Sequence, residues 1–124
     1  ELLARAFEIR SAGLLGYQPV LEACAQCRQP ANGRLFFSPG LGGVVCEGCR
    51  SASAETLLPC SRGAVETMKT LQRWHPERLP QLKVDRATRN QIKTLMYNYL
   101  SYHLERELKS AAFLERLGPG EDDV

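Results

Sequence analysis

Four cysteines form two close pairs whose spacing is typical of a metal site. Two residues lie between Cys24 and Cys27, two lie between Cys46 and Cys49, and eighteen residues lie between the pairs. Each pair can hold one side of a tetrahedron, so the spacing predicts one structural Zn²⁺ per chain, bound by four thiolates. Protein sulfur would fill every coordination position and leave none for a reactive water.

Two other uses of these cysteines are open from the spacing alone. Disulfides would require an oxidising compartment, but nothing in the sequence indicates secretion, and the total of five cysteines is odd. An iron–sulfur cluster also takes four cysteines, and spacing does not separate it from zinc. The fifth cysteine, Cys60, has no second thiol nearby, so we expect it to be a small buried side chain outside the metal shell.

The segment between the cysteine pairs has the composition of a hairpin. It is rich in proline and glycine, which excludes a helix. Residues 34–37 and 44–45 favour strands and flank a glycine-rich turn at 38–43. We therefore predict a short two-stranded hairpin that brings the second cysteine pair back to the first.

Apolar spacing predicts helices on both sides of this hairpin. The first covers residues 2–15 and ends at Gly16. Its apolar stripe comprises Leu2, Leu3, Ala6, Phe7, Ile9, Leu14 and Leu15. A second helix begins at the N-cap Ser61 and stops before Pro76. The third begins near Asp85 or Thr88, and a last helical piece ends at Gly118.

The expected fold is mainly α, a small helical bundle with an inserted four-cysteine zinc ribbon or β-hairpin. Residues 1–23 form the first helix and connection, 24–49 the zinc-binding hairpin insert, 50–118 the helical remainder of the same domain, and 119–124 a disordered acidic tail. We expect the helices to pack separately from the hairpin, so that loss of the metal leaves them largely intact.

Length and composition fit one globular domain. The chain has 124 residues, 44% hydrophobic and 24% charged. No run of about 18 apolar residues occurs, so we expect no membrane-spanning helix. The first residues lack a Met and a basic flank, which does not suit a signal peptide, and they resemble the inside of a helix. We expect a chain cut from a longer protein.

Basic residues concentrate in one part of the chain. The net charge is only +2, but residues 62–93 hold eight Lys and Arg against three Asp and Glu, a local charge of +5. Cations neutralise DNA phosphates, so we take four of them as candidate DNA contacts. They are Lys83, Arg86, Arg89 and Lys93. The alternative is a solvated helix face.

Enzyme signatures are absent from the sequence. Residues 40–43 are glycine-rich but lack the lysine and the serine or threonine of a phosphate loop, and no nucleophile motif appears. His75 and His103 have no evident catalytic partner. We therefore expect no catalysis.

Several motifs, taken in order, resemble the RecO family of bacterial DNA repair proteins. In the first half they are Ala6, Phe7, Glu8, Ile9 and Arg10, then Leu14, Leu15, Gly16, Tyr17 and Pro19, then the four cysteines with Phe37, Ser38, Gly42 and Gly43. Near the end they are Tyr99, Leu100, His103, Leu104, Glu107, Leu108, Lys109, Ser110, Phe113 and Leu114. The resemblance implies a recombination mediator of the bacterial cytoplasm, which helps anneal strands and load recombinase.

The resemblance also implies which part of such a protein this is. Family members begin with an oligonucleotide-binding barrel of about 75 residues, and nothing here reads as one. The chain resembles the C-terminal helical and zinc-binding region, a scaffold and docking surface. Not every member has the cysteines, so the zinc would stabilise the hairpin only. The implied partners are RecR, the C-terminal tail of the single-stranded DNA-binding protein, and single-stranded DNA, the last mainly through the absent barrel.

The tail of the single-stranded DNA-binding protein is acidic and apolar, so it should seek an apolar groove rimmed by arginine. Arg5, Phe7 and Arg10 are the candidate residues, unless the arginines only form the solvated face of the helix. Two other functions are possible. One is a generic zinc-ribbon nucleic-acid module, with Trp74 stacking on a base. The other is an accessory piece of an enzyme whose catalytic residues lie elsewhere in a longer chain.

Overall fold

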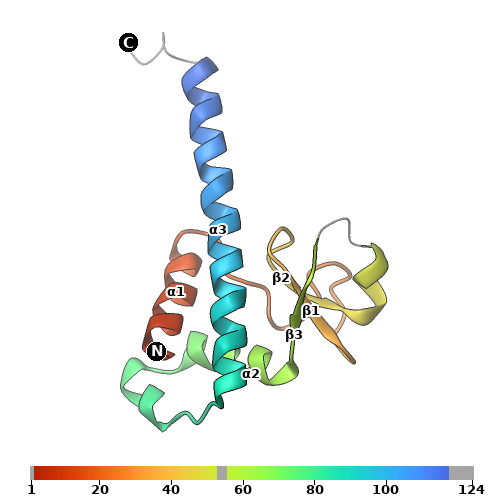
Figure 1. The fold of residues 1–124 in the computed structure, drawn as a ribbon, viewed down its shortest axis with the longest axis vertical. Coiled ribbons are helices and arrows are strands. Elements are labelled where there is room, and N and C mark those ends of the chain that lie inside the picture. The colour runs from red at the N-terminus through yellow and green to blue at the C-terminus, as the bar shows by residue number, and fades with distance from the viewer. Residues whose placement is uncertain (1, 53–55, 118–124) are drawn as a thin grey trace.

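The computed structural model describes residues 2–52 and 56–117 as a helical body joined to a small antiparallel sheet (Figure 1). The α-helices are α1 (Leu2–Leu14), α2 (Arg62–Arg73) and α3 (Arg86–Leu117). Two 3-10 helices are η1 (Glu47–Ala52) and η2 (Pro76–Gln81). The strands are β1 (Leu35–Ser38), β2 (Gly43–Cys46) and β3 (Leu58–Cys60). The predicted fold class is confirmed, while the predicted acidic tail at 119–124 lies outside the described residues.

Helix α1 ends where the sequence predicts, at Gly16. The φ of Gly16 is +91°, and its N–H donates to the carbonyl of Gly13 at 3.1 Å. The N–H of Tyr17 donates to Ala12 O at 2.6 Å, which completes a Schellman motif. Glycine adopts this left-handed conformation without steric cost, so the helix stops here and the chain turns toward the sheet.

The buried face of α1 differs from the predicted stripe. Ala6, Ile9 and Ala12 are buried, whereas Phe7 is 71% and Leu14 90% exposed. Ala6 and Ile9 belong to the predicted stripe, whereas Ala12 does not. The two alanines on either side of Ile9 allow α1 to lie close against α2 and α3 (Figure 1).

Helix α2 is capped at both ends. The Ser61 hydroxyl accepts the N–H of Ala64 at 3.1 Å, as expected for an N-cap. At the other end, the Arg10 guanidinium donates to Leu71 O at 3.0 Å and also to Trp74 O. A cation from α1 thus satisfies carbonyl groups at the negative end of α2.

Helix α3 is one continuous helix, where the sequence suggested a separate last piece. Its first half packs in the core through Ile92, Leu95, Met96 and Tyr99. Residues 104–117 are all exposed, and the C-terminal end of the helix projects beyond the body, past the contact of Glu107 with Tyr17 (Figure 1). No helix in the described part of the chain is long and apolar enough to cross a membrane.

The predicted hairpin is present, and a third strand extends it. Strand β1 is central, with Phe37 paired to Val44 of β2 and to Leu58 of β3. The third strand was not predicted, because it is short and contains Pro59. Proline lacks an N–H and is tolerated on an edge strand, which is where β3 lies.

The sheet and the helices share one core. Phe37 and Val44 are fully buried together with residues of all three α-helices, and the Phe37 ring meets the Tyr99 ring edge-on at 5.6 Å. The opposite face holds a second, smaller cluster made by Cys24, Phe36 and Val45. The expectation that the helices pack separately from the hairpin is therefore wrong.

Candidate functional site

The four paired cysteines lie together at one end of the sheet. Cys24 and Cys27 lie in the connection after α1, Cys46 ends β2, and Cys49 is in η1. All four sulfur atoms are within 4.8 Å of one another, and the Sγ atoms of Cys27 and Cys46 are 3.9 Å apart. Four sulfurs at 2.3 Å from one zinc ion would be about 3.8 Å apart, so the cluster fits a tetrahedral ion.

Backbone amides favour a thiolate at Cys24. The N–H groups of Gln26, Cys27 and Cys46 point to its Sγ at 3.3, 3.5 and 3.4 Å. Burial raises the pKa of this thiol, but the three donors outweigh burial and lower the pKa to about 6. Burial and hydrogen bonds from the other thiols raise the pKa of Cys49 to about 12. Four thiolates would therefore need a cation to neutralise their mutual repulsion.

Local backbone contacts place the first cysteine pair against β2. Ala25 N–H donates to Val44 O at 2.7 Å, and Val20 forms a bridge with Gly43. A Cβ atom on Gly43 would be 2.4 Å from the Val20 carbonyl oxygen, so only glycine permits this approach. Gly43 thereby lets the connection after α1 reach the cysteine cluster.

Cys60 lies outside the cysteine cluster, as expected. It ends β3, it is buried in the shared core, and it is absent from the group of sulfurs described above. Burial raises its pKa to about 12, so the thiol is protonated and unreactive at neutral pH.

The structure brings one predicted tail-binding residue to the predicted DNA-binding residues. A hollow of about 360 Å³ between α1 and α3, here called the basic hollow, is formed mostly by cationic side chains. It is lined by Leu2, Arg5, Arg86, Arg89, Asn90 and Lys93. Arg5 also pairs with Glu8 at 2.9 Å. Lys83 is exposed in the connection before α3 and does not line this hollow.

An apolar groove lies next to the basic hollow and shares two of its residues, Leu2 and Arg89. This groove, about 360 Å³, is lined by Leu2, Leu3, Pro76, Leu79, Pro80, Leu82 and Arg89. Neither Phe7 nor Arg10 lines it: Phe7 projects into solvent, and Arg10 caps α2. Sequence reasoning missed the contribution of η2, although the apolar residues between Pro76 and Leu82 were a visible signal.

Two further features bear on the predicted chemistry. The Trp74 ring is half-buried, and the Arg78 guanidinium lies 4.2 Å from its centroid, so one ring face is occupied.

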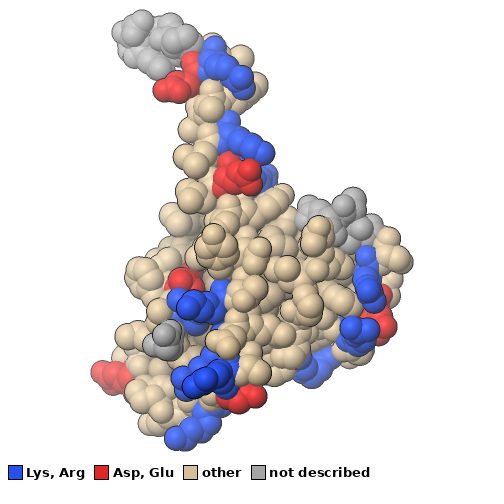
Figure 2. All heavy atoms as spheres, viewed as in Figure 1, with Lys and Arg blue, Asp and Glu red and all other residues tan. Residues whose placement is uncertain are grey.

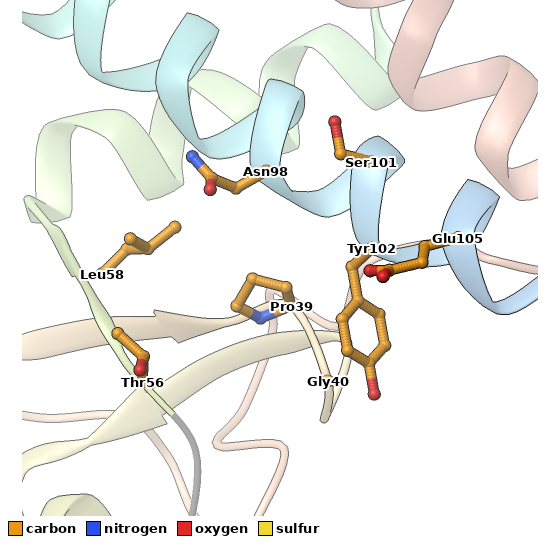
Figure 3. A pocket seen from close by; sticks show the side chains of 8 residues that line it. All are labelled: Pro39, Gly40, Thr56, Leu58, Asn98, Ser101, Tyr102 and Glu105. Carbon is orange, nitrogen blue, oxygen red and sulfur yellow. The ribbon is translucent and has the colours of Figure 1, made fainter.

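The hollow of about 450 Å³ in Figure 3 lies between the β1–β2 turn and α3. Its lining residues are Pro39, Gly40, Thr56, Leu58, Asn98, Ser101, Tyr102 and Glu105. This lining contains no histidine or cysteine.

Comparison with known proteins gives a consistent set of relatives. Residues 1–112 match the family described as "Recombination protein O C terminal". The chain is 48% identical over 118 residues to a DNA repair protein RecO of Pelotomaculum thermopropionicum, covering 95% of this chain and 46% of that protein. It is 39% identical over 119 residues to that of Moorella thermoacetica, covering 94% and 44%. The chain thus spans about half the length of these relatives. No solved structure matches it significantly.

Proposed function

The chain belongs to the RecO family, and on this premise we propose that it is the C-terminal part of a DNA repair and recombination mediator in the bacterial cytoplasm. It would serve as a scaffold and docking surface for recombination partners on single-stranded DNA. The observation that carries this proposal is the family match over residues 1–112, because the relatives are named DNA repair proteins. RecR and single-stranded DNA are proposed partners, the latter mainly through a barrel in the longer protein.

The metal in this proposal is one structural Zn²⁺ held by Cys24, Cys27, Cys46 and Cys49. The support is the sulfur cluster, whose spacing suits a tetrahedral ion. Bound zinc would tie the connection after α1 to β2 and η1, and an all-sulfur shell supplies no catalytic water. We accordingly propose a non-enzymatic role. One zinc per chain by atomic absorption supports the site, and retention of zinc after Cys46→Ser would contradict it.

Docking of the tail of the single-stranded DNA-binding protein is supported by the apolar groove beside the basic hollow. The tail's apolar end would fill the groove, and its carboxylates would pair with Arg5 and the neighbouring cations. Phe7 would contact the tail at the rim. Since Arg10 donates to two carbonyls of α2, we propose that its part is to hold α1 in place.

The tail proposal is tested with a fluorescent peptide of the tail. Arg5→Glu should weaken its binding by about 5- to 150-fold while helix content by circular dichroism is unchanged. Arg73→Glu, the same charge change on an exposed residue of α2, is the control. Equal affinity of the Arg5→Glu variant and the parent would remove Arg5 from the site.

Direct contact of this chain with DNA phosphates is proposed for Lys83, Arg86, Arg89 and Lys93. Three of these line the basic hollow, which is the supporting observation. Reversal of Lys83, Arg86 and Arg89 to Glu should reduce DNA binding and its salt dependence together. The alternative, a generic zinc-ribbon nucleic-acid module, would also need Trp74 for stacking. Trp74→Ala distinguishes the two, because a loss of DNA binding would favour the generic module.

A further inference from the structure

The strongest unassigned surface is a second group of arginines at the sheet. We propose that one single strand of nucleic acid runs from the basic hollow, across the first turns of α3, to Arg34, Arg50 and Arg62 beside the zinc site. The inference rests on the proposed DNA contact by the basic hollow and extends that contact to a second region. It gives the zinc-bound hairpin a share of the binding surface.

A second cationic hollow lies on the sheet side of α3. It is about 310 Å³ and is here called the hairpin hollow. Its polar lining includes Arg34 just before β1, Arg62 of α2 and Gln91 of α3. The Ser61 N–H donates to Gln91 Oε1 at 2.7 Å, so α3 is fixed against the start of α2 at this point. Arg62 donates to Ala31 O at 2.9 Å, which holds its side chain while leaving other N–H groups available.

Two of the arginines are held by an aromatic ring. The guanidinium carbons of Arg34 and Arg50 lie 5.6 and 4.9 Å from the centroid of Phe36. Both residues are exposed, while Phe36 itself is buried. Cation–π contact limits the motion of these side chains, so less entropy is lost when they bind a phosphate. Guanidinium planes are also surfaces on which unpaired bases stack.

The charges of these two hollows are largely uncompensated. Within the described part of the chain, no carboxylate lies within 4.0 Å of the basic nitrogens of a set of six cations. They are Arg34, Arg50, Arg62, Arg86, Arg89 and Lys93. By contrast, Lys69 and Arg73 of α2 pair with Glu22 at 3.7 and 2.7 Å. These six cations therefore attract a polyanion, whereas Lys69 and Arg73 are neutralised. Arg5, which also lines the basic hollow, pairs with Glu8.

A path across α3 joins the two hollows. Asn90 lines the basic hollow and its neighbour Gln91 lines the hairpin hollow. At 3.6 residues per turn, the side chains of Ala87 and Thr94 project between these two directions, and both are exposed. They are small, and α3 carries no acidic residue before Glu105. Figure 2 shows one group of Lys and Arg over α1 and the lower part of α3 and another along the sheet side, besides those on the projecting end of α3.

An exposed aromatic ring favours a nucleic acid over an acidic peptide as the occupant. Tyr97 is 72% exposed and follows Lys93 by one helical turn. Both line a further depression on α3 together with Arg5. Cationic grooves with aromatic rings that stack on bases are the combination found in proteins that bind single strands. Repeated charge on both sides of a helix suits an extended ligand, because a lone anion would fill only one hollow.

The test compares three double charge reversals in the 124-residue chain, each of which changes the net charge equally. Arg34→Glu with Arg62→Glu alters the hairpin hollow, Arg86→Glu with Arg89→Glu the basic hollow, and Lys69→Glu with Arg73→Glu is the control. Binding of a 20-nucleotide fluorescent single strand is measured by anisotropy at several salt concentrations. Zinc content and circular dichroism verify folding, and Arg→Gln pairs replace any reversal that unfolds.

We expect the hairpin and basic-hollow variants each to lose at least tenfold in affinity and the control less than threefold. Each of the first two variants should also reduce the slope of log affinity against log salt concentration by about 1.4, which corresponds to two single-strand phosphates. Tyr97→Ala should weaken the strand at least fivefold. If only the basic-hollow variant loses affinity, the inference is overturned and the proposed function survives. If both variants bind like the control, the proposed DNA contact fails too. If the Tyr97→Ala variant binds the nucleic acid as tightly as the parent, an acidic peptide is the favoured ligand and the proposed path of a nucleic-acid strand is overturned.

Discussion

The two faces of the three-stranded sheet are stabilised in different ways. On one face, Phe37 and Val44 are buried in the core that α1, α2 and α3 also form. On the other face, only Cys24, Phe36 and Val45 are buried, with Cys46, Cys49 and Leu57 packed around them. Three short strands with so few apolar contacts on one side are not stable alone. Three of the clustered cysteines, Cys24, Cys46 and Cys49, pack on this face.

This difference shows that a cysteine cluster and an apolar core can contact the same strands from opposite sides. Val44 and Val45 are neighbours in β2, yet one belongs to the helical core and the other to the cysteine cluster. A disturbance on either face must reach the other through the strands they share. We therefore expect the hairpin to unfold together with the helices, and each prediction below tests how strongly the two faces are coupled.

We expect the largest loss of stability from changes on the face of the sheet that carries the cysteine cluster. Cys24→Ser removes a thiolate that accepts three backbone N–H groups, and we expect loss of the zinc. Zinc binding contributes about 10 to 16 kcal/mol in small peptides, more than most domains have as total stability. Thermal unfolding by circular dichroism should then shift strongly for helices and sheet together. Cys60→Ala is the control and should keep one zinc per chain.

The coupling is contradicted if the two faces respond separately. A Cys24→Ser protein whose helical signal melts at the parent temperature would show that the helices do not depend on the metal face. A chelator such as EDTA added to the unmodified chain gives the same comparison without a substitution.

A smaller effect is expected on the apolar face. Phe37→Ala leaves a cavity beside Tyr99 in the shared core and should lower the free energy of unfolding by about 3 to 5 kcal/mol. Phe36→Ala should cost less, because one side of that ring is covered only by the exposed guanidinium groups of Arg34 and Arg50. Urea unfolding of both variants checks the order. A larger loss for Phe36→Ala would reverse the comparison.

The contact that joins the first cysteine pair to β2 gives the next effect. Gly43→Ala places a Cβ atom 2.4 Å from Val20 O, and backbone must move to accept it. We expect a loss of about 1 to 3 kcal/mol in urea unfolding. Gly48→Ala is a matched control, since its Cβ would make an ordinary 3.9 Å contact with Cys46 Sγ. Equal stability of the two variants would show that Val20 moves freely.

The smallest expected change in stability comes from His103 in the helical body, and it depends on pH. His103 stacks on Tyr17 at 4.4 Å, and its Nε2 is buried without a hydrogen-bond partner in the described structure. Burial and then the charge of Arg106 lower the pKa of His103, against a smaller opposite effect of Glu107. The unfolded chain binds the proton more readily, so the free energy of unfolding should fall as pH drops below about 6.5.

The variant His103→Phe keeps a ring in the stack but cannot titrate. Its free energy of unfolding between pH 7 and pH 5 should fall less than that of the parent. Parallel pH dependence of the two proteins would assign the acid sensitivity to other groups.

Much of the fold follows from local sequence signals. The Ser61 cap, the Gly16 stop and the glycine-rich turn of the hairpin all act within a few residues, so their positions could be predicted. The cysteine cluster follows likewise, because its spacing encodes the geometry of the sulfurs. For the same reason the sequence predicts that Cys60 lies outside the cluster.

The remaining features depend on contacts between distant segments. Strand β3 exists because β1 offers a free edge to Pro59 and its neighbours. The buried face of α1 is set by close packing on α2 and α3, which the size of its apolar residues does not reveal. Arg10 could not be identified as a cap for a helix that begins some fifty residues later.

The free half of α3 gives one helix two kinds of hydrogen-bond protection. Amides in its first half are covered by the core, and their exchange with deuterium requires opening of the whole domain. Residues 108–117 are exposed and lie beyond the contact of Glu107 with Tyr17, and we expect their amides to exchange by fraying from the C-terminal end. Deuterium uptake along this single helix thus separates fast local opening from global unfolding. Slower uptake in residues 108–117 would report a bound partner there without any change in the core.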